Sequence, residues 1–348
     1  MKTKVINLLL VLALVGCSKK QPGKVSGDAA KTMPSITVVE TSETKERNQL
    51  KAQALELLNT KNYTALEALA SKYRSGKDCY PDGYWKLAVV YNGLELDDNA
   101  PETEWQSRQK LLVDWIKARP ESVMARITLA RFLTYYAWNA RSSAYAKEVK
   151  DTQWKLFYAR LKQAWDVIKA AKSLQEKCPI YWSSVQQIAL GSQLGKAQYD
   201  EIFNEAIQAF PDYGYYYNNR ACFLLPRWYG AKGEWEIDLA KSADKIGGEK
   251  GDVLYARVVW DMHHYGNTVN VFKENTLSWE RVDRGFAAII KVYPDSLSAK
   301  NERAYLAAQA GDQPNAQKYF LETKGEVDLS VWGNKEEFDA GLKWAFPP

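Results

Sequence analysis

The sequence predicts an all-α protein in which antiparallel helix pairs stack into an irregular solenoid with insertions. Three observations support this prediction. Apolar residues recur with a helical period from about residue 46 onward, prolines end several of these segments, and an alanine follows each of those prolines at a fixed distance. A chain of 348 residues with 46% hydrophobic and 26% charged residues also has the composition of a folded protein.

The N-terminus has the pattern of a bacterial lipoprotein signal. Lys2 and Lys4 precede an apolar run over residues 5–15 that is too short to cross a bilayer as a mature helix. The run ends at Leu14-Val15-Gly16-Cys17, which resembles a lipobox, in which small residues admit the peptidase and the thiol accepts diacylglycerol. We therefore expect residues 1–16 to be removed and Cys17 to carry a lipid anchor. An ordinary secretory signal with a chance cysteine is the alternative.

Ser18 opens a segment that we expect to be a flexible tether. It stands where an Asp would signal retention in the inner membrane, so the resemblance implies the outer membrane of a bacterial cell envelope. Residues 18–44 are rich in Lys, Ser, Thr, Gly and Pro and lack a sustained apolar period. We assign residues 17–44 to the lipidated cysteine and its tether, and residues 45–348 to one helical domain. The β-prone residues 36–39 are interpreted as linker, with a short strand as the alternative.

Within the helical domain, two segments show the period most clearly. Their apolar residues each form one stripe along a helix: Tyr199, Ile202, Phe203, Ala206, Ile207 and Phe210 in the first, and Val282, Phe286, Ile289, Ile290 and Tyr293 in the second. Proline stops an incoming helix and suits the first turn of the next one. We place helix boundaries at Arg119-Pro120, Cys178-Pro179, Phe210-Pro211 and Tyr293-Pro294.

A repeat appears when the chain is aligned on these prolines. Ten residues after each of them lies an alanine, at Ala130, Ala189, Ala221 and Ala304. A small residue is needed where two helices of a hairpin cross closely, and the pattern continues with Ala316 and Phe320 as in tetratricopeptide (TPR) repeats. The spacing of the prolines is uneven. We therefore expect a TPR-like solenoid that is decorated by insertions around residues 139–152 and 230–278.

Four aromatic-rich segments resemble an uncharacterised bacterial family of TPR-like proteins, known as domain of unknown function 4034. They include Tyr84-Trp85-Lys86-Leu87, Trp138-Asn139-Ala140-Arg141, Leu224-Leu225-Pro226-Arg227-Trp228-Tyr229-Gly230 and Gly251-Asp252-Val253-Leu254-Tyr255-Ala256. The resemblance covers roughly residues 45–335. It implies a TPR-like helical fold and no established activity.

Two aromatic and basic clusters are the candidate ligand-binding site. Each opens one of the expected insertions, at the turn of a helix pair, and equivalent turns of a solenoid line up along one edge. Arginines there suit a carboxylate or phosphate, and the aromatic faces suit a sugar or a peptide side chain. The alternative is that the aromatics fill the seam between hairpins while the arginines pair with Glu234, Glu236 or Asp252. The candidate residues are Trp138, Arg141, Arg227, Trp228, Tyr229 and Trp235.

Other kinds of site have weaker support. Glu234 and Glu236 are paired carboxylates beside an aromatic residue, but two positions apart on a helix they point in different directions. His263 and His264 are the only histidines, and as neighbours on a helix they diverge too far to bind one metal ion. A net charge of +5 argues against nucleic acid as the main partner. We therefore expect no cofactor, no metal site and no enzymatic activity.

Three cysteines, Cys79, Cys178 and Cys222, remain after acylation of Cys17. An odd number in an oxidising compartment allows one disulfide and one thiol, or three thiols, and the sequence does not choose between them.

These observations lead to one main hypothesis and two alternatives. We expect a membrane-tethered binding or scaffold protein of the cell envelope whose partner is a protein or a peptide. The first alternative is a glycan-binding lipoprotein that stacks sugars on an aromatic groove. The second is an envelope hydrolase that uses Glu234 or Glu236. The sequence leaves the oligomeric state open.

Overall fold

A computed structural model describes residues 36–142, 146–174, 176–265 and 270–347. The chain divides into two units, residues 1–32 and residues 33–348, and all described residues belong to the second. The expected signal peptide, Cys17 and most of the expected tether lie outside the described residues.

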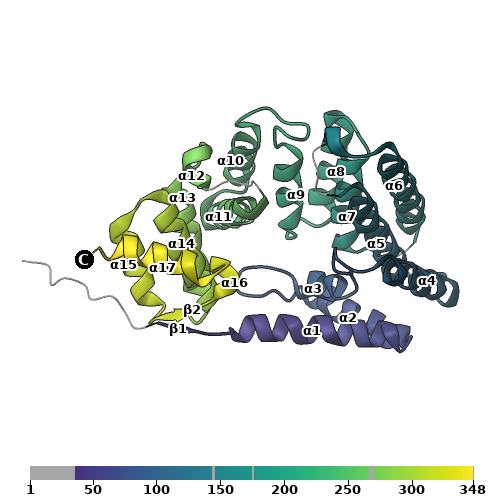
Figure 1. The fold of residues 1–348 in the computed structure, drawn as a ribbon, viewed down its shortest axis with the longest axis horizontal. Coiled ribbons are helices and arrows are strands. Elements are labelled where there is room, and N and C mark those ends of the chain that lie inside the picture. Colours follow the sequence, from purple (N-terminus) through teal and green to yellow (C-terminus); the bar gives the residue numbers. More distant parts are fainter. Residues whose placement is uncertain (1–35, 143–145, 175, 266–269, 348) are drawn as a thin grey trace, which may run out of the picture. The chain divides into compact units, whose positions relative to one another are not determined.

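The described residues are almost entirely helical, which confirms the all-α prediction (Figure 1). The helices of the first half are α1 (Ser42–Asn59), α2 (Tyr63–Gly76), α3 (Lys86–Asn92), α4 (Glu102–Ala118), α5 (Val123–Arg141), the short 3₁₀ helix η1 (Ala146–Glu148), α6 (Asp151–Lys172), α7 (Pro179–Gly191) and α8 (Lys196–Ala209). Those of the second half are α9 (Tyr215–Phe223), α10 (Glu234–Ile246), α11 (Gly248–Tyr265), α12 (Val271–Glu274), α13 (Trp279–Val292), α14 (Leu297–Ala310), α15 (Gln313–Glu322), α16 (Leu329–Trp332) and α17 (Lys335–Ala345). Two short strands, β1 (Thr37–Val38) and β2 (Glu326–Val327), complete the described elements.

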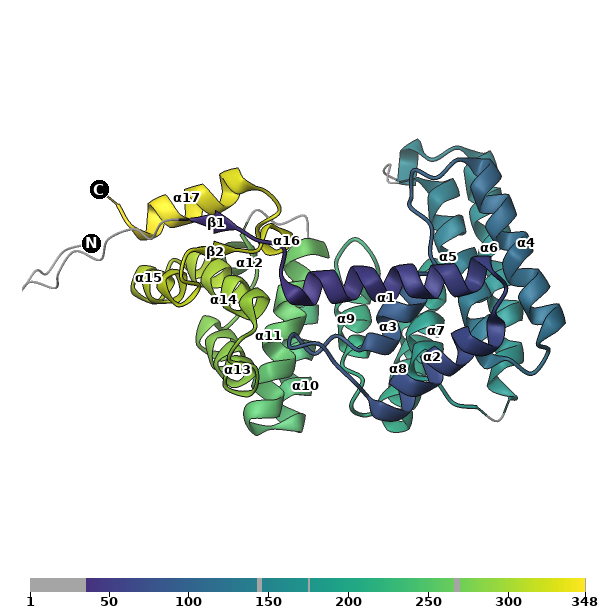
Figure 2. The ribbon, with the colours of Figure 1, turned by 90° about the horizontal axis from the view of Figure 1, so that it is seen from below.

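Helices that follow one another in the chain pack against each other as pairs. The main pairs are α5 with α6, α7 with α8, α10 with α11 and α14 with α15 (Figure 2). The four alanines of the sequence repeat lie on α5, α7, α9 and α14, and each is at most 4% exposed. These buried positions agree with the expectation that a small residue is required where helices cross closely.

Three of the four prolines follow the end of a helix, as expected. The helices α4, α8 and α13 each end two residues before a proline, at Pro120, Pro211 and Pro294. At Cys178-Pro179 the arrangement differs, because α6 already ends at Lys172 and Pro179 is the first residue of α7. Proline is well suited to that first position, since the N–H that it lacks would have no partner within the helix.

The second expected insertion is not a decoration. Residues 230–278 contain α10, α11 and α12, and α11 packs against α9 and α13. Val258 and Val259 of α11 are fully buried in the hydrophobic core. The long interval between Pro211 and Pro294 therefore contains a helix pair that belongs to the core. The sequence analysis did not recognise this pair, because glycines interrupt the apolar period there.

The N-terminal part of the described chain is more ordered than expected. β1 pairs in parallel with β2, although almost the whole helical domain separates them in the sequence. The Val39 N–H donates to the Val327 carbonyl at 3.0 Å, and α1 begins at Ser42 with the Thr41 hydroxyl as its N-cap. The assignment of a tether up to residue 44 was therefore wrong for residues 37–44. The β-branched residues there needed a distant partner strand that no local pattern indicates.

None of the helices in the described ranges is both long enough and apolar enough to span a membrane.

Candidate functional site

The two predicted aromatic clusters do meet, and their half-buried side chains pack against each other. The Trp138 ring lies edge-on to the Trp228 ring with 5.5 Å between centroids, and edge-on to Phe157 at 4.8 Å. The guanidinium of Arg141 lies over the rings of Trp138 and Trp154, at 5.8 and 5.5 Å. Tyr229 stacks on Phe223 at 4.5 Å, and its hydroxyl donates to the Leu190 carbonyl. We call Trp138, Arg141, Trp228 and Tyr229 the seam.

The two remaining predicted residues, Trp235 and Arg227, are not part of the seam. Trp235 is buried in the hydrophobic core at 3% exposure, and Arg227 is exposed. None of the six predicted residues lines the large cavity described below. The rings of the two clusters contact each other edge-on, which agrees with the packed alternative of the sequence analysis rather than with an open pocket between them. Their role in ligand binding stays a prediction that this geometry does not favour.

The paired carboxylates of the hydrolase hypothesis are also separated. Glu234 forms an ion pair with Lys196 at 2.7 Å and accepts from the Ala231 N–H at the start of α10. Glu236 is buried at 5% exposure. Since one lies at the surface in a helix cap and the other lies in the interior, they do not share a cleft in which one bond is held between two acids.

The contacts of His263 and of the three cysteines do not indicate a catalytic or metal-binding role. The Nε2 atom of His263 lies 2.7 Å from the Tyr305 hydroxyl. Cys79, Cys178 and Cys222 are free thiols, which resolves the choice that the sequence left open. Burial raises the pKa of Cys222 to about 11, so this thiol is unreactive at neutral pH. Among the described residues, no group of three His, Cys, Asp or Glu side chains is arranged to hold a metal ion.

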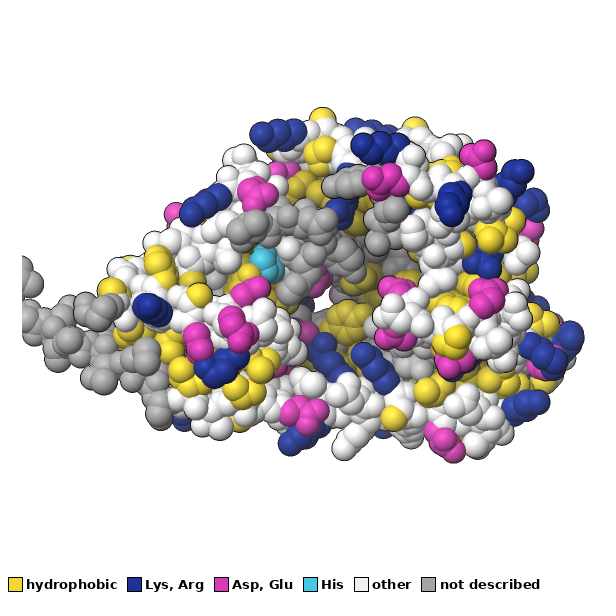
Figure 3. Space-filling view, in the orientation of Figure 1, with side chains coloured by type: hydrophobic (Ala, Val, Ile, Leu, Met, Phe, Trp, Pro, Cys, Tyr) yellow, Lys and Arg dark blue, Asp and Glu magenta, His cyan; other side chains and the backbone are white. Residues whose placement is uncertain are grey.

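The structure contains a different candidate site, a cavity of about 800 Å³. Most of its walls come from α1, the loop before α3, the N-terminal end of α9, and helices α11, α13 and α14, which lie far apart in the sequence. Residues of α3, α10 and α16 also line it. Figure 3 shows a hollow in one face of the molecule, with basic, acidic and hydrophobic side chains around it. Such a volume is typical of ligand-binding pockets.

The loop that leads into α3 is pinned by backbone hydrogen bonds. The Lys86 N–H donates to the Asp78 carbonyl, the Tyr80 N–H to the Tyr84 carbonyl, and the Gly83 N–H to the Tyr80 carbonyl, at 2.9, 2.9 and 2.7 Å. Gly83 has a φ of +81°, which favours glycine. Any side chain at this position would collide with Arg257, because an added Cβ would lie 1.9 Å from its Cζ atom.

Arg47 of α1 holds this loop from the other side. Its Nη2 atom donates to Asp82 Oδ2 at 2.6 Å, while Asp82 Oδ1 accepts from the Tyr84 N–H at 2.9 Å. The guanidinium also lies 4.4 Å from the centroid of the Tyr80 ring. Asp82 is therefore a paired carboxylate at the edge of the cavity, with its negative charge compensated.

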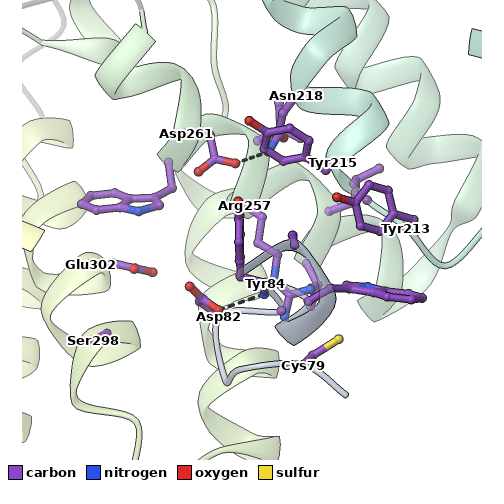
Figure 4. Close-up of a pocket in the computed structure, with 18 of the residues that line it drawn as sticks. Cys79, Asp82, Tyr84, Tyr213, Tyr215, Asn218, Arg257, Asp261, Ser298 and Glu302 are labelled. Atoms are coloured by element: carbon purple, nitrogen blue, oxygen red, sulfur yellow. Dashed lines mark hydrogen bonds between the residues drawn. The ribbon is translucent and has the colours of Figure 1, made fainter. Parts of the chain in front are cut away.

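Two further carboxylates, Asp261 of α11 and Glu302 of α14, point into the cavity (Figure 4). Asp261 accepts a hydrogen bond from the Asn218 side-chain amide. Burial, and then the nearby charge of Asp82, raise the pKa of Asp261 to about 7. Burial, with the charges of Asp82 and Asp261, also raises the pKa of Glu302 well above its ordinary value. In both cases burial and the neighbouring carboxylates outweigh the nearby arginines, Arg257 at Asp261 and Arg47 at Glu302.

Another carboxylate on the same helix shows the opposite behaviour. Asp252 of α11 forms ion pairs with Arg281 and Arg284 at 2.9 and 2.8 Å. Burial alone would raise the pKa of Asp252, but these two arginines outweigh it and the pKa is lowered. The raised pKa of Asp261 therefore results from its place in the cavity rather than from a general property of α11.

Aromatic rings complete the walls of the cavity. Tyr84 lies edge-on to Tyr215 with 6.2 Å between centroids, and Trp85 lies edge-on to Tyr213 at 5.3 Å. Tyr217 and Trp260 also line the cavity. The site thus combines flat apolar surfaces with charged groups of both signs, as sites for organic ligands with polar ends commonly do.

Sequence reasoning missed this site because its residues are dispersed. Asp82, Arg257, Asp261 and Glu302 stand on three segments, and no short motif joins them. One signal was present: Glu302 follows the helical spacing of the buried residues Ala299 and Leu306 of α14. A charged residue on an otherwise apolar helix face is a recognisable sign of a polar site in the interior.

Comparison of the chain with protein-family models, with curated proteins and with solved structures finds no match.

Proposed function

We propose that the protein is a binding protein of the bacterial cell envelope that receives part of a protein or peptide partner in the cavity. The cavity itself carries this proposal: about 800 Å³ with walls of aromatic and charged side chains from segments that are far apart in the chain. Pairs of helices commonly present such surfaces to peptides and to partner proteins.

The proposal retains the lipid anchor at Cys17, the outer membrane as location, and the TPR-like solenoid with its likeness to domain of unknown function 4034. It includes no catalytic step and no cofactor. The arrangement at the N-terminus supports an anchored receptor, because β1 and α1 connect the tether to the cavity, and Arg47 of α1 lines it.

Photo-cross-linking tests this function. A benzoylphenylalanine placed at Tyr215, which lines the cavity, should cross-link to a partner in envelope extracts when the full-length chain is supplied in detergent. The matched control is the same group at Tyr158, a 40% exposed tyrosine on α6 that does not line the cavity. A species that cross-links at position 215 and not at 158 supports the proposal. Equal labelling at both positions, or none at 215, contradicts it.

Glycan capture is the second candidate function, and the aromatic walls favour it. Sugars stack on flat aromatic faces, and Tyr84, Tyr215 and Trp260 line the same cavity. Oligosaccharides that enter would change the fluorescence of Trp85 and Trp260. A titration across a panel of glycans should then give a saturable change that Trp260→Phe diminishes. An unchanged spectrum with every glycan would reject this candidate.

A further inference from the structure

Two groups of opposite charge face the cavity without a direct partner. Arg257 forms no hydrogen bond or ion pair with any residue in the described ranges, and its Nε atom is buried without an acceptor. Glu302 is only 6% exposed and likewise has no hydrogen bond or ion pair within the described part of the chain. A buried charge that lacks a partner is costly, and such groups are retained where a ligand supplies the partner.

Other charged residues near Glu302 do form ion pairs. Arg303 follows Glu302 directly, and its Nε atom donates to Asp283 at 2.9 Å. Asp82 is likewise paired, with Arg47. Among the other charged residues that line the cavity, Lys51, Asp212, Glu249 and Lys250 are exposed, and Glu43 is half-buried on α1. The remaining charged residues of the lining are Arg257, Asp261 and Glu302. Figure 4 shows these three side chains directed toward the same space from α11 and α14.

We propose that the cavity binds a zwitterionic ligand, a peptide with a C-terminal lysine or arginine, whose cationic side chain lies between Asp261 and Glu302 and whose carboxylate pairs with Arg257. Two carboxylates suit an ammonium or guanidinium group, and a guanidinium suits a carboxylate through two parallel hydrogen bonds. The aromatic rings of Tyr84 and Tyr215 would cover the aliphatic part of the ligand. This inference rests on the proposed function and specifies its ligand.

Binding of such a ligand should release protons. Around Asp261 and Glu302 stand Asn218 of α9, Arg257 of α11, Asp82 of the loop, and Glu43 and Arg47 of α1. Burial and the mutual repulsion of the carboxylates raise the pKa of Asp261 to about 7 and that of Glu302 well above its ordinary value. A cation between them favours their ionised forms. Affinity should therefore increase as the pH rises from about 6 to 8.

Calorimetric titration of the full-length chain in detergent tests the ligand class with three peptides. N-acetyl-Ala-Ala-Lys carries both charges, the norleucine analogue lacks the cation, and the lysinamide analogue lacks the carboxylate. The first should bind, and each analogue should bind about tenfold more weakly. In buffers of different ionisation enthalpy, binding of the first peptide at pH 7 should release protons.

Two isosteric or near-isosteric variants assign each charge to its partner. Glu302→Gln should remove the preference for lysine over norleucine, and Arg257→Gln should remove the preference for the acid over the amide. Asp252→Asn, which changes a paired carboxylate of α11 that does not line the cavity, should retain both preferences. Thermal unfolding of each variant verifies that it is folded. A merely structural role of either residue would weaken all three peptides equally.

The outcomes separate this inference from the function on which it rests. Equal affinity for the three peptides, or preferences that the variants leave unchanged, overturns the zwitterionic ligand. If none of the peptides binds while Tyr215 still gives a specific cross-link, the inference fails and the binding function stands. Absence of both signals rejects both proposals.

Discussion

The seam and the cavity contain the same types of residue, aromatic and charged, but these residues have different contacts in the two regions. In the seam, Trp138 and Trp228 contact each other and Arg141 lies over two indole rings. In the cavity, Arg257 and Glu302 lack direct partners among the described residues. Both regions contain buried polar atoms without a hydrogen bond, Arg141 Nε and Trp228 Nε1 in the seam and Arg257 Nε in the cavity. The difference is that ring contacts join the residues of the seam, whereas the cavity leaves open space beside its charged groups, and this space is what suggests a binding site.

The largest effect on stability is expected from the seam. Trp138→Ala removes ring contacts with Phe157 and Trp228 and should lower the free energy of unfolding by about 4 kcal/mol. Urea denaturation measures this loss. Trp344→Ala serves as the control, because Trp344 is 40% exposed, and it should change stability little. Under native conditions, cross-linking from position 215 should persist in Trp138→Ala. Loss of that cross-link in a folded variant would mean that the seam takes part in binding.

A second large effect is expected at the base of the cavity. Gly83→Ala forces an L-residue to a φ of +81° and also displaces the end of the flexible Arg257 side chain, so it should cost about 2 kcal/mol. Gly233→Ala is the matched control, with a φ of +82° but open space around the added Cβ, and it should cost about 1 kcal/mol. Thermal unfolding compares the two. Adding Arg257→Ala should recover part of the difference, and equal costs at both glycines would refute this account.

Replacing Glu302 or Asp261 should stabilise the protein, whereas most substitutions of buried residues destabilise it. Glu302→Gln removes a buried charge and should raise stability at pH 8 by about 1 kcal/mol. The pKa of Asp261 is raised to about 7, so between about pH 4 and pH 7 the folded chain binds more protons than the unfolded chain. Stability should therefore fall as the pH rises through this range, and Asp261→Asn should reduce that slope.

Asp252→Asn provides the control for these two variants. The pKa of Asp252 is lowered in the folded chain, so its charge stabilises the protein above the ordinary pKa of an Asp and that contribution is lost as the pH falls. The variant should be destabilised at pH 7 and should approach the stability of the wild type in acid. Chemical denaturation at several pH values measures all three variants. A gain for Asp252→Asn at pH 7 would contradict the assigned pairing.

The smallest effect is expected at the N-terminal strand. Val39→Pro removes the hydrogen bond from the Val39 N–H to the Val327 carbonyl and should cost about 1 kcal/mol. Hydrogen exchange should become faster at residues 37–39 while α14 stays protected. The control Val38→Thr replaces a side chain that is 47% exposed and keeps every backbone donor, so it should leave exchange unchanged. Faster exchange throughout α14 would show that β1 supports more of the fold than this pairing implies.

Local patterns predicted much of the helical architecture. The apolar stripe from Tyr199 to Phe210 became α8, and the stripe from Val282 to Tyr293 became α13. Ala130 and Ala304 are fully buried on α5 and α14, in agreement with the small-residue positions of the repeat. These features depend on residues within a few turns of each other, and therefore the sequence contains the information directly.

The candidate site required the tertiary structure. Asp82, Asp261 and Glu302 lie 179 and 41 residues apart in the chain, and only the packing of α11 against its neighbours brings them to one cavity. The same holds for β1, whose partner strand lies almost 290 residues away. By itself, the sequence determined that the protein is helical and where α4, α8 and α13 end, because backbone hydrogen bonding and apolar periodicity act locally. Which charges remain without a partner was decided by the folded chain alone, since burial and electrostatic pairing depend on distances that long-range contacts create.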